Sequence, residues 1–288
     1  MATDRDRGSE TRQGGVETDS MKQKERPDAA DTSQMSFGAH LEVLRQMLLR
    51  IIAVAGAVAV AVFCLKDTTW ALLLAPSECD FCTYRWIERM ARAVGLSDFR
   101  FSQFHVDLIA TDLSSQFMTH VSTSCYLGLL CASPYIVYEL FRFVSPALYA
   151  SERRYSVRVA VAAYALFVTG VLLTYYVLFP VAFRFLGTYS VDARIHSTIT
   201  LDSYVSTFVA LTLVMGVVFQ LPVVAFCLAR MGIVRATMLA RYRRHALLLI
   251  MVVSAVITPP DLMTLLLVGV PLYMLYELSI RVVRWAET

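Results

Sequence analysis

The sequence predicts an all-α, polytopic membrane protein with six transmembrane helices, of which the last two are short. Hydrophobic residues make up 57% of the 288 residues and charged residues only 17%, with a mean hydropathy of +0.57. A typical soluble domain is about 45–50% apolar and about 25% charged. The uncharged residues are gathered in long runs, which is the pattern of helices that cross a bilayer.

Six apolar runs define the predicted spans. A polar tail, residues 1–34, precedes a membrane domain that covers residues 35–288. The tail has almost no large apolar side chain, so we expect it to be disordered, and it lacks the apolar core of a secretory signal. The six spans are expected at about 47–65, 118–143, 159–183, 204–229, 246–257 and 262–280.

An amphipathic helix leads into the first span. Leu41, Leu44 and Leu48 recur at helical spacing, and Ser36 is available as the helix cap. Arg50 lies near the beginning of the apolar run, where its side chain can reach the membrane interface.

A long loop, residues 66–117, separates the first two spans and is expected to form a small ordered cap on one membrane face. It shows helical spacing over residues 84–94 and carries Cys79 and Cys82 as a C-x-x-C. A disulfide fits if the loop lies outside the cytoplasm. A metal site would need further ligands, and of the histidines only His105 lies in the same loop.

Polar groups inside two spans leave alternatives open. Glu139 and Arg142 are three residues apart and share one helix face. They either form an ion pair at the membrane interface, or Glu139 faces a partner helix or a cavity. In the fourth span Pro222 predicts a kink. Gln220 beside it either hydrogen-bonds a carbonyl freed by the kink or forms a polar site inside the bilayer.

The last two apolar runs are expected to form a hairpin around Thr258-Pro-Pro-Asp261. Residues 246–257 extend only about 18 Å as a helix, against a hydrocarbon core of about 30 Å. We therefore expect the bilayer to thin beside this hairpin, or another protein to fill the gap.

The distribution of basic residues predicts both termini in the cytoplasm. With that orientation, and without the tail, the inner segments hold 13 Lys and Arg and the outer segments 7. The predicted location is the cytoplasmic (inner) membrane of a bacterium.

No motif for catalysis, nucleotide binding or nucleic-acid binding is present, and we expect neither an enzyme nor a cofactor. What stands out is a cytoplasmic face with few acids among many bases. Isolated carboxylates there, such as Glu42 and Glu152, suit a guanidinium, whose planar fork pairs with a carboxylate. Glu152 would also suit the first turn of the next helix, with Ser151 as its cap.

The chain resembles the TatC family, the membrane subunit of the twin-arginine protein translocase. The stretches that carry the resemblance are His40-Leu41…Leu44-Arg45, Ile109-Ala-Thr-Asp112, Phe143…Pro146-Ala-Leu-Tyr149…Glu152-Arg-Arg154, Phe179-Pro180, Phe219…Pro222 and Thr258-Pro-Pro-Asp261. They extend over about residues 36–280, in this order among six apolar runs.

The resemblance implies a receptor for the twin-arginine signal peptides of folded cargo. Its partners would be single-span TatA- and TatB-type subunits, membrane lipids and further copies of the chain, and the proton gradient would drive transport. Residues expected to bind the signal peptide are Glu42, Arg45, Phe143, Leu148, Tyr149, Glu152, Arg153 and Arg154. Residues expected to make polar or partner contacts within the membrane are Glu139, Gln220, Pro222, Asp261 and Glu277.

The chain departs from the family pattern at several positions. The usual H-L-x-E-L-R motif has its acid where this chain has Val43, and Glu42, about 100° away around the helix, is the conditional replacement. Gln220 replaces a frequent Glu, Glu139 a frequent Gln, and Leu265 a common polar residue. We therefore expect Glu152 to carry more of the recognition here than in relatives.

Two other functions compete with this one. A small-solute secondary transporter would need charges at mid-membrane and internal repeats, and neither is evident in the sequence. A structural membrane scaffold that transports nothing is the third possibility.

Overall fold

A computed structural model describes residues 37–78, 80–93, 108–148, 153–189, 192, 198–258 and 261–287, and for 37–40, 144–148 and 153–156 it describes the backbone only. Its elements are α1 (Phe37–Cys64), α2 (Lys66–Leu74), a 3-10 turn η1 (Ala75–Ser77), α3 (Cys82–Ala93), β1 (Leu108–Ile109), α4 (Ser115–Cys131), α5 (Ser133–Leu148), α6 (Arg153–Leu173), a π-helical segment η2 (Thr174–Leu178), α7 (Phe179–Thr188), β2 (Ile199–Thr200), α8 (Leu201–Val218), α9 (Leu221–Arg230), α10 (Ala236–Arg241), α11 (Arg243–Ile257) and α12 (Leu262–Glu287).

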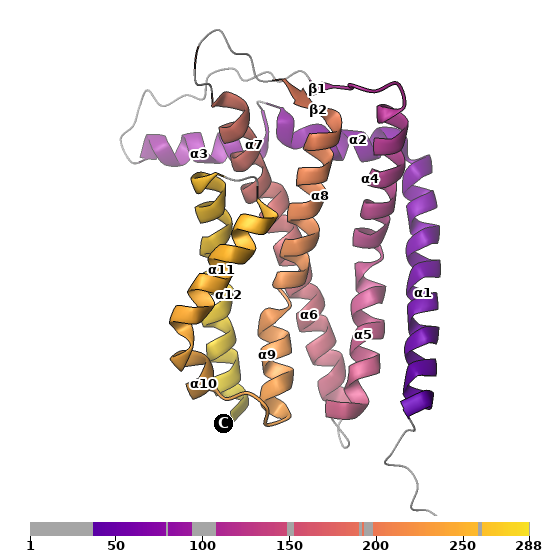
Figure 1. Cartoon of the computed structure of the whole chain (residues 1–288), viewed down its shortest axis with the longest axis vertical. Coiled ribbons are helices and arrows are strands. Elements are labelled where there is room, and N and C mark those ends of the chain that lie inside the picture. The colour runs from indigo at the N-terminus through magenta and orange to yellow at the C-terminus, as the bar shows by residue number, and fades with distance from the viewer. Residues whose placement is uncertain are drawn as a thin grey trace, which may run out of the picture. The chain divides into compact units, whose positions relative to one another are not determined.

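The chain divides into two units, Met1–Glu42 and Val43–Thr288, and the packing described below belongs to the second. Within it, α2 and α3 lie at one end of the long helices and α10 lies at the other (Figure 1). We call residues 66–93 the cap and name the two ends accordingly. The predicted boundary between residues 34 and 35 lies outside the described residues and stays a prediction.

The long apolar helices confirm a helical, polytopic membrane protein. Four stretches are long and apolar enough to cross a membrane: Leu41–Cys64, Val157–Thr188, Leu201–Arg230 and Leu262–Glu287. A fifth span results if α4 and α5 are counted together. The predicted span at 246–257 corresponds to α11, which has 15 residues and is about 22 Å long. The count of six spans therefore stays a prediction.

The second predicted span, 118–143, is not one continuous helix. It is broken at Ala132 into α4 and α5, whose axes differ in direction by 53°. Pro134 is the second residue of α5 and has no N–H to donate to the preceding turn, which explains the break. The predicted span thus stays a prediction, and the bend within it is a feature that the sequence analysis did not anticipate.

The cap is held at an interruption of the third span. Pro180 cannot donate to the carbonyl of Tyr176, four residues earlier, and the helix widens into η2 just before it. The Thr83 hydroxyl in α3 donates to that Tyr176 carbonyl instead. The neighbouring Tyr84 hydroxyl lies 3.0 Å from the Pro180 carbonyl and 3.1 Å from the Pro76 carbonyl. The helix predicted at residues 84–94 is thus found as α3, which covers residues 82–93, and its Thr83 serves the backbone carbonyl that Pro180 leaves without a helical donor.

A histidine ties the cap to two further helices. Trp70 Nε1 donates to His120 Nδ1 (3.1 Å), so Nε2 carries the ring proton and donates to the Phe63 carbonyl (3.2 Å). The rings of Phe63 and His120 also stack, with centroids 4.4 Å apart. The neutral histidine therefore joins α2, α4 and the last turn of α1.

The core lies where α7 and α8 meet at the cap end. Phe179 packs edge-on against Tyr204 and Phe208, and Phe183 packs edge-on against Tyr204, each pair with ring centroids 5.0 Å apart. All four side chains are buried. Edge-to-face pairs of this kind stabilise by about 0.5–1.5 kcal/mol beyond the area that they bury.

Glycines let the helices approach closely. A Cβ atom at Gly170 would meet Phe219 at 2.8 Å, and one at Gly216 would meet Phe167 at 2.7 Å, so α6 and α8 each receive a phenylalanine of the other. A Cβ atom at Gly128 of α4 would lie 2.6 Å from the Ala59 backbone of α1. Small residues at such crossings are typical of membrane helix packing.

We predict that Gly128→Ala destabilises the protein by about 1–3 kcal/mol, because α1 must move to admit the methyl group. Gly56→Ala is the matched control, since nothing lies within 4 Å of a Cβ atom there. That control should be neutral, or more stable by up to about 1 kcal/mol from helix propensity. Thermal unfolding in detergent, followed by circular dichroism, compares the two; equal midpoints would contradict the close α1–α4 contact.

We also predict that Tyr84→Phe destabilises the protein by about 0.5–1.5 kcal/mol, because the hydrogen bond from its buried hydroxyl to the cap-end backbone is lost. Tyr189→Phe is the control, since Tyr189 is 64% exposed. The same unfolding measurement applies. If Tyr84→Phe unfolds at the temperature of the control, Tyr84 does not hold the cap.

Candidate functional site

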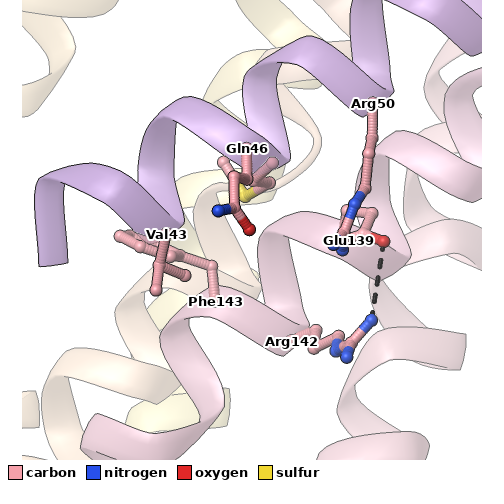
Figure 2. Close-up of a pocket in the computed structure, with 7 residues that line it drawn as sticks. Val43, Gln46, Arg50, Glu139, Arg142 and Phe143 are labelled. Carbon is pink, nitrogen blue, oxygen red and sulfur yellow. Dashed lines mark ion pairs between the residues drawn. The ribbon is translucent and has the colours of Figure 1, made fainter. Parts of the chain in front are cut away.

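A cavity of about 250 Å³ lies between α1 and α5 and is the candidate site. It is lined by Val43, Gln46, Met47, Arg50, Glu139, Arg142 and Phe143. The α1 residues recur at intervals of three or four, as do those of α5, so each helix turns one face toward the cavity (Figure 2). The walls thus combine apolar side chains, an amide, a carboxylate and two guanidinium groups.

Glu139 is the buried acid of this cavity, with 5% of its surface exposed. Its Oε1 accepts a hydrogen bond from the Tyr135 hydroxyl (3.1 Å) and lies 3.7 Å from Nη1 of Arg142. The predicted placement of Glu139 and Arg142 on one helix face is confirmed, and Glu139 also faces a cavity. The two interpretations left open by the sequence therefore apply together.

Arg50 gives the cavity a second cation. Figure 2 shows its side chain extending from α1 toward Glu139. Among the described residues, no ion pair joins Arg50 to a carboxylate, and Glu139 pairs with Arg142 instead. Counting Glu139, Arg50 and Arg142, the cavity has a formal charge of +1.

Gln220 lies apart from this cavity, at the break between α8 and α9. Its Nε2 donates to the carbonyl of Ala163 in α6 (3.0 Å). Pro222, buried in the first turn of α9, is placed to interrupt the helix, as predicted. The carbonyl that Pro222 leaves without a helical donor is that of Val218, so Gln220 satisfies a different backbone group from the one considered in the sequence. Its amide joins two spans.

Asp261 and Glu277 have local partners. Asp261 Oδ1 accepts from the backbone N–H of Thr264 (2.7 Å), and Oδ2 accepts from the Thr264 hydroxyl, which is the contact of a residue that caps α12. Glu277 pairs with Arg243 of α11 (2.8 Å) and accepts from the Tyr273 hydroxyl (3.4 Å). These contacts fix the α11–α12 hairpin and leave the predicted partner contacts untested.

The residues predicted to bind the signal peptide are described to different extents. Glu152 and Tyr149 lie outside the described residues, and Leu148, Arg153 and Arg154 are described by their backbone at the ends of α5 and α6. Glu42 and Arg45 lie on α1 with exposed side chains. Among the three whose side chains are described, Glu42, Arg45 and Phe143, it is Phe143 that lines the cavity.

The cysteines of the C-x-x-C remain partly described. Cys82, the first residue of α3, is an exposed free thiol, and Cys79 lies outside the described residues. In this structure Cys82 is not part of a disulfide.

The sequence did not predict the cavity, although it held a signal for it. Arg50 was interpreted as a side chain that reaches the interface, and Gln46 and Met47 were not singled out. Val43, Met47 and Arg50 share one helix face, as do Glu139, Arg142 and Phe143. Because one face carries a cation and the other an acid, the sequence could have been used to predict that α1 and α5 are neighbours.

Comparison with known proteins supports the helical membrane fold described above and the resemblance of the sequence to the TatC family. Residues 39–271 match the family described as Sec-independent protein translocase protein (TatC). The TatC protein of Desulforapulum autotrophicum is 32% identical over 85% of this chain and 82% of its own length, and that of Escherichia coli K12 is 36% identical over 60% and 67%. A crystal structure described as the twin arginine translocase receptor TatC superposes with a TM-score of 0.69 at 26% identity, over 86% of this chain and all of that one. The chain therefore belongs to the TatC family of Sec-independent protein translocase proteins.

Proposed function

We propose that this chain is the receptor and core subunit that binds twin-arginine signal peptides and, with TatA- and TatB-type subunits, exports folded proteins using the proton gradient. The observation that carries the proposal is family membership over residues 39–271, together with a relative of known structure that is described as a twin arginine translocase receptor. The chain's own sequence adds an acid followed by two arginines: Glu152 in the connection between α5 and α6, and Arg153 and Arg154 at the start of α6.

The charges of the cavity support a location for the signal's arginines outside it. Glu139, the acid of the cavity, already pairs with Arg142 and accepts a hydrogen bond from Tyr135, so it is less available to a further guanidinium group. α5 ends at Leu148, five residues after Phe143, and the connection that contains Glu152 follows in the sequence. Val43 and Phe143 line the same cavity, so the first part of α1 and the end of α5 lie together and this connection follows directly. We therefore assign the arginine pair to Glu152, with Glu42 as a second candidate acid.

We further propose six spans with both termini in the cytoplasm. In this arrangement α11 crosses despite its 15 residues, with the bilayer thinned beside it or a partner helix filling the gap. The excess of Lys and Arg on the predicted inner segments supports the orientation. The cap would then lie on the outer face and Glu152 on the inner face.

We predict that Glu152→Ala abolishes crosslinking of a twin-arginine signal peptide, while Glu152→Asp retains part of it. Truncating one member of a desolvated charge pair costs about 2–5 kcal/mol, which corresponds to at least about thirtyfold in affinity. Site-specific crosslinking to the peptide in membranes measures the effect. Asp67→Ala, in the cap, is the control that should crosslink like the unmodified protein; undiminished crosslinking of Glu152→Ala would sink the assignment.

The topology is tested with single cysteines in a chain whose six native cysteines are serine. Met231 and Trp285 flank the α11–α12 hairpin and are 47% and 72% exposed. If both helices cross, Met231→Cys and Trp285→Cys react with an impermeant reagent only in permeabilised cells, whereas Tyr189→Cys reacts in intact cells. Should α11 fail to cross, positions 231 and 285 would lie on opposite sides and label differently.

A further inference from the structure

The α1–α5 cavity contains more positive charge than its own acid neutralises. Glu139 is paired with Arg142 and hydrogen-bonded by Tyr135, so its carboxylate is already engaged. Arg50 contributes a further guanidinium to the same wall. An arginine in apolar surroundings is stabilised by a carboxylate or phosphate that its planar fork can bind, so the cavity is suited to an anion.

The depth of the two arginines in the membrane points to the source of the anion. Arg50 lies three residues, about 4.5 Å, inside the apolar run that begins at Met47. Arg142 lies one residue before the end of the apolar run 118–143. Both therefore lie at the border of the hydrocarbon region at the end away from the cap, where lipid phosphates are found.

The exposure of this wall favours lipid as the occupant. Only 6% of the apolar stretch of α1 is buried inside the protein, and Arg50 is exposed. The Arg142 side chain is 62% exposed. In a bilayer such side chains meet lipid first. The apolar members of the wall, Val43, Met47 and Phe143, offer a surface for a glycerol backbone and the start of an acyl chain.

We infer that the cavity between α1 and α5 binds the headgroup of an anionic phospholipid, with its phosphate held by Arg50 and Arg142. Glu139 has two roles in this site: it positions Arg142, and it limits the charge of the cavity to +1.

The test measures lipid binding by the full-length protein in neutral detergent, without signal peptide or partner subunits. Native mass spectrometry gives the affinities for phosphatidylglycerol and for phosphatidylcholine. We expect a preference for phosphatidylglycerol that Arg50→Gln and Arg142→Gln each reduce by about fivefold, the factor that corresponds to one basic residue near a membrane surface. Arg50→Lys, which keeps the charge, should retain most of the preference.

Two further variants separate a binding role from a structural one. Glu139→Gln raises the formal charge of the cavity to +2 and should strengthen phosphatidylglycerol binding by a similar factor, which loss of structure would not do. Arg281→Gln removes an exposed arginine from α12, outside the cavity, and should change nothing.

The proposal is overturned if the two lipids bind alike, if Arg281→Gln weakens binding as much as Arg50→Gln, or if Glu139→Gln weakens it. Displacement of the lipid by glycerol phosphate would show that the site takes a soluble phosphate and not a lipid. Displacement only by a transmembrane peptide that carries an acidic residue would show that a protein helix is the occupant. None of these outcomes bears on signal-peptide crosslinking at Glu152, so the two proposals fail independently.

Discussion

Backbone groups that lose their helical partner inside an apolar bundle must find another donor or acceptor, and this constraint organises the structure. Pro180 deprives the Tyr176 carbonyl of its donor, and the Thr83 hydroxyl of the cap replaces it. At the break before Pro222, the Gln220 side chain bonds the α6 backbone instead. Each interruption of a span thus becomes a point at which two elements are joined. The cap depends on such a point, since Tyr84 beside Thr83 contacts the carbonyl of Pro180 itself.

The α1–α5 cavity differs from the rest of the bundle in how its polar groups are paired. Most of the polar side chains described within the spans serve a backbone group or a neighbour on the same or the next helix. The cavity instead gathers Arg50, Glu139 and Arg142 with a charge that its own members do not balance. In a membrane protein an unbalanced charge at the edge of the hydrocarbon region is costly unless a ligand, lipid or water completes it.

The sequence predicted the helical membrane class, the family, the α3 helix and the shared face of Glu139 and Arg142, because these depend on composition and on spacing along one helix. It did not predict the break at Ala132, because residues 118–143 read as one apolar run and Pro134 alone does not say whether a helix bends or breaks. Arg50 and Glu139 are about ninety positions apart in the sequence, and whether they line one cavity depends on which helices become neighbours. The partner of Gln220 could not be predicted either, because every residue has a main-chain carbonyl and the sequence does not show which one lies near the Gln220 side chain. Glu152, on which recognition is expected to depend most, lies in a connection outside the described residues.

The central claim is that this chain acts as a twin-arginine receptor and translocase core, and complementation tests it most directly. The chain is expressed in a bacterial strain that lacks its own TatC, and export of a folded reporter with a twin-arginine signal peptide is measured. The account predicts that export is restored, and that it is lost when the two arginines of the signal are replaced by lysines, because lysine lacks the planar fork that a carboxylate binds. A stable, membrane-inserted chain that restores no export, or that exports the lysine signal equally well, would contradict the account.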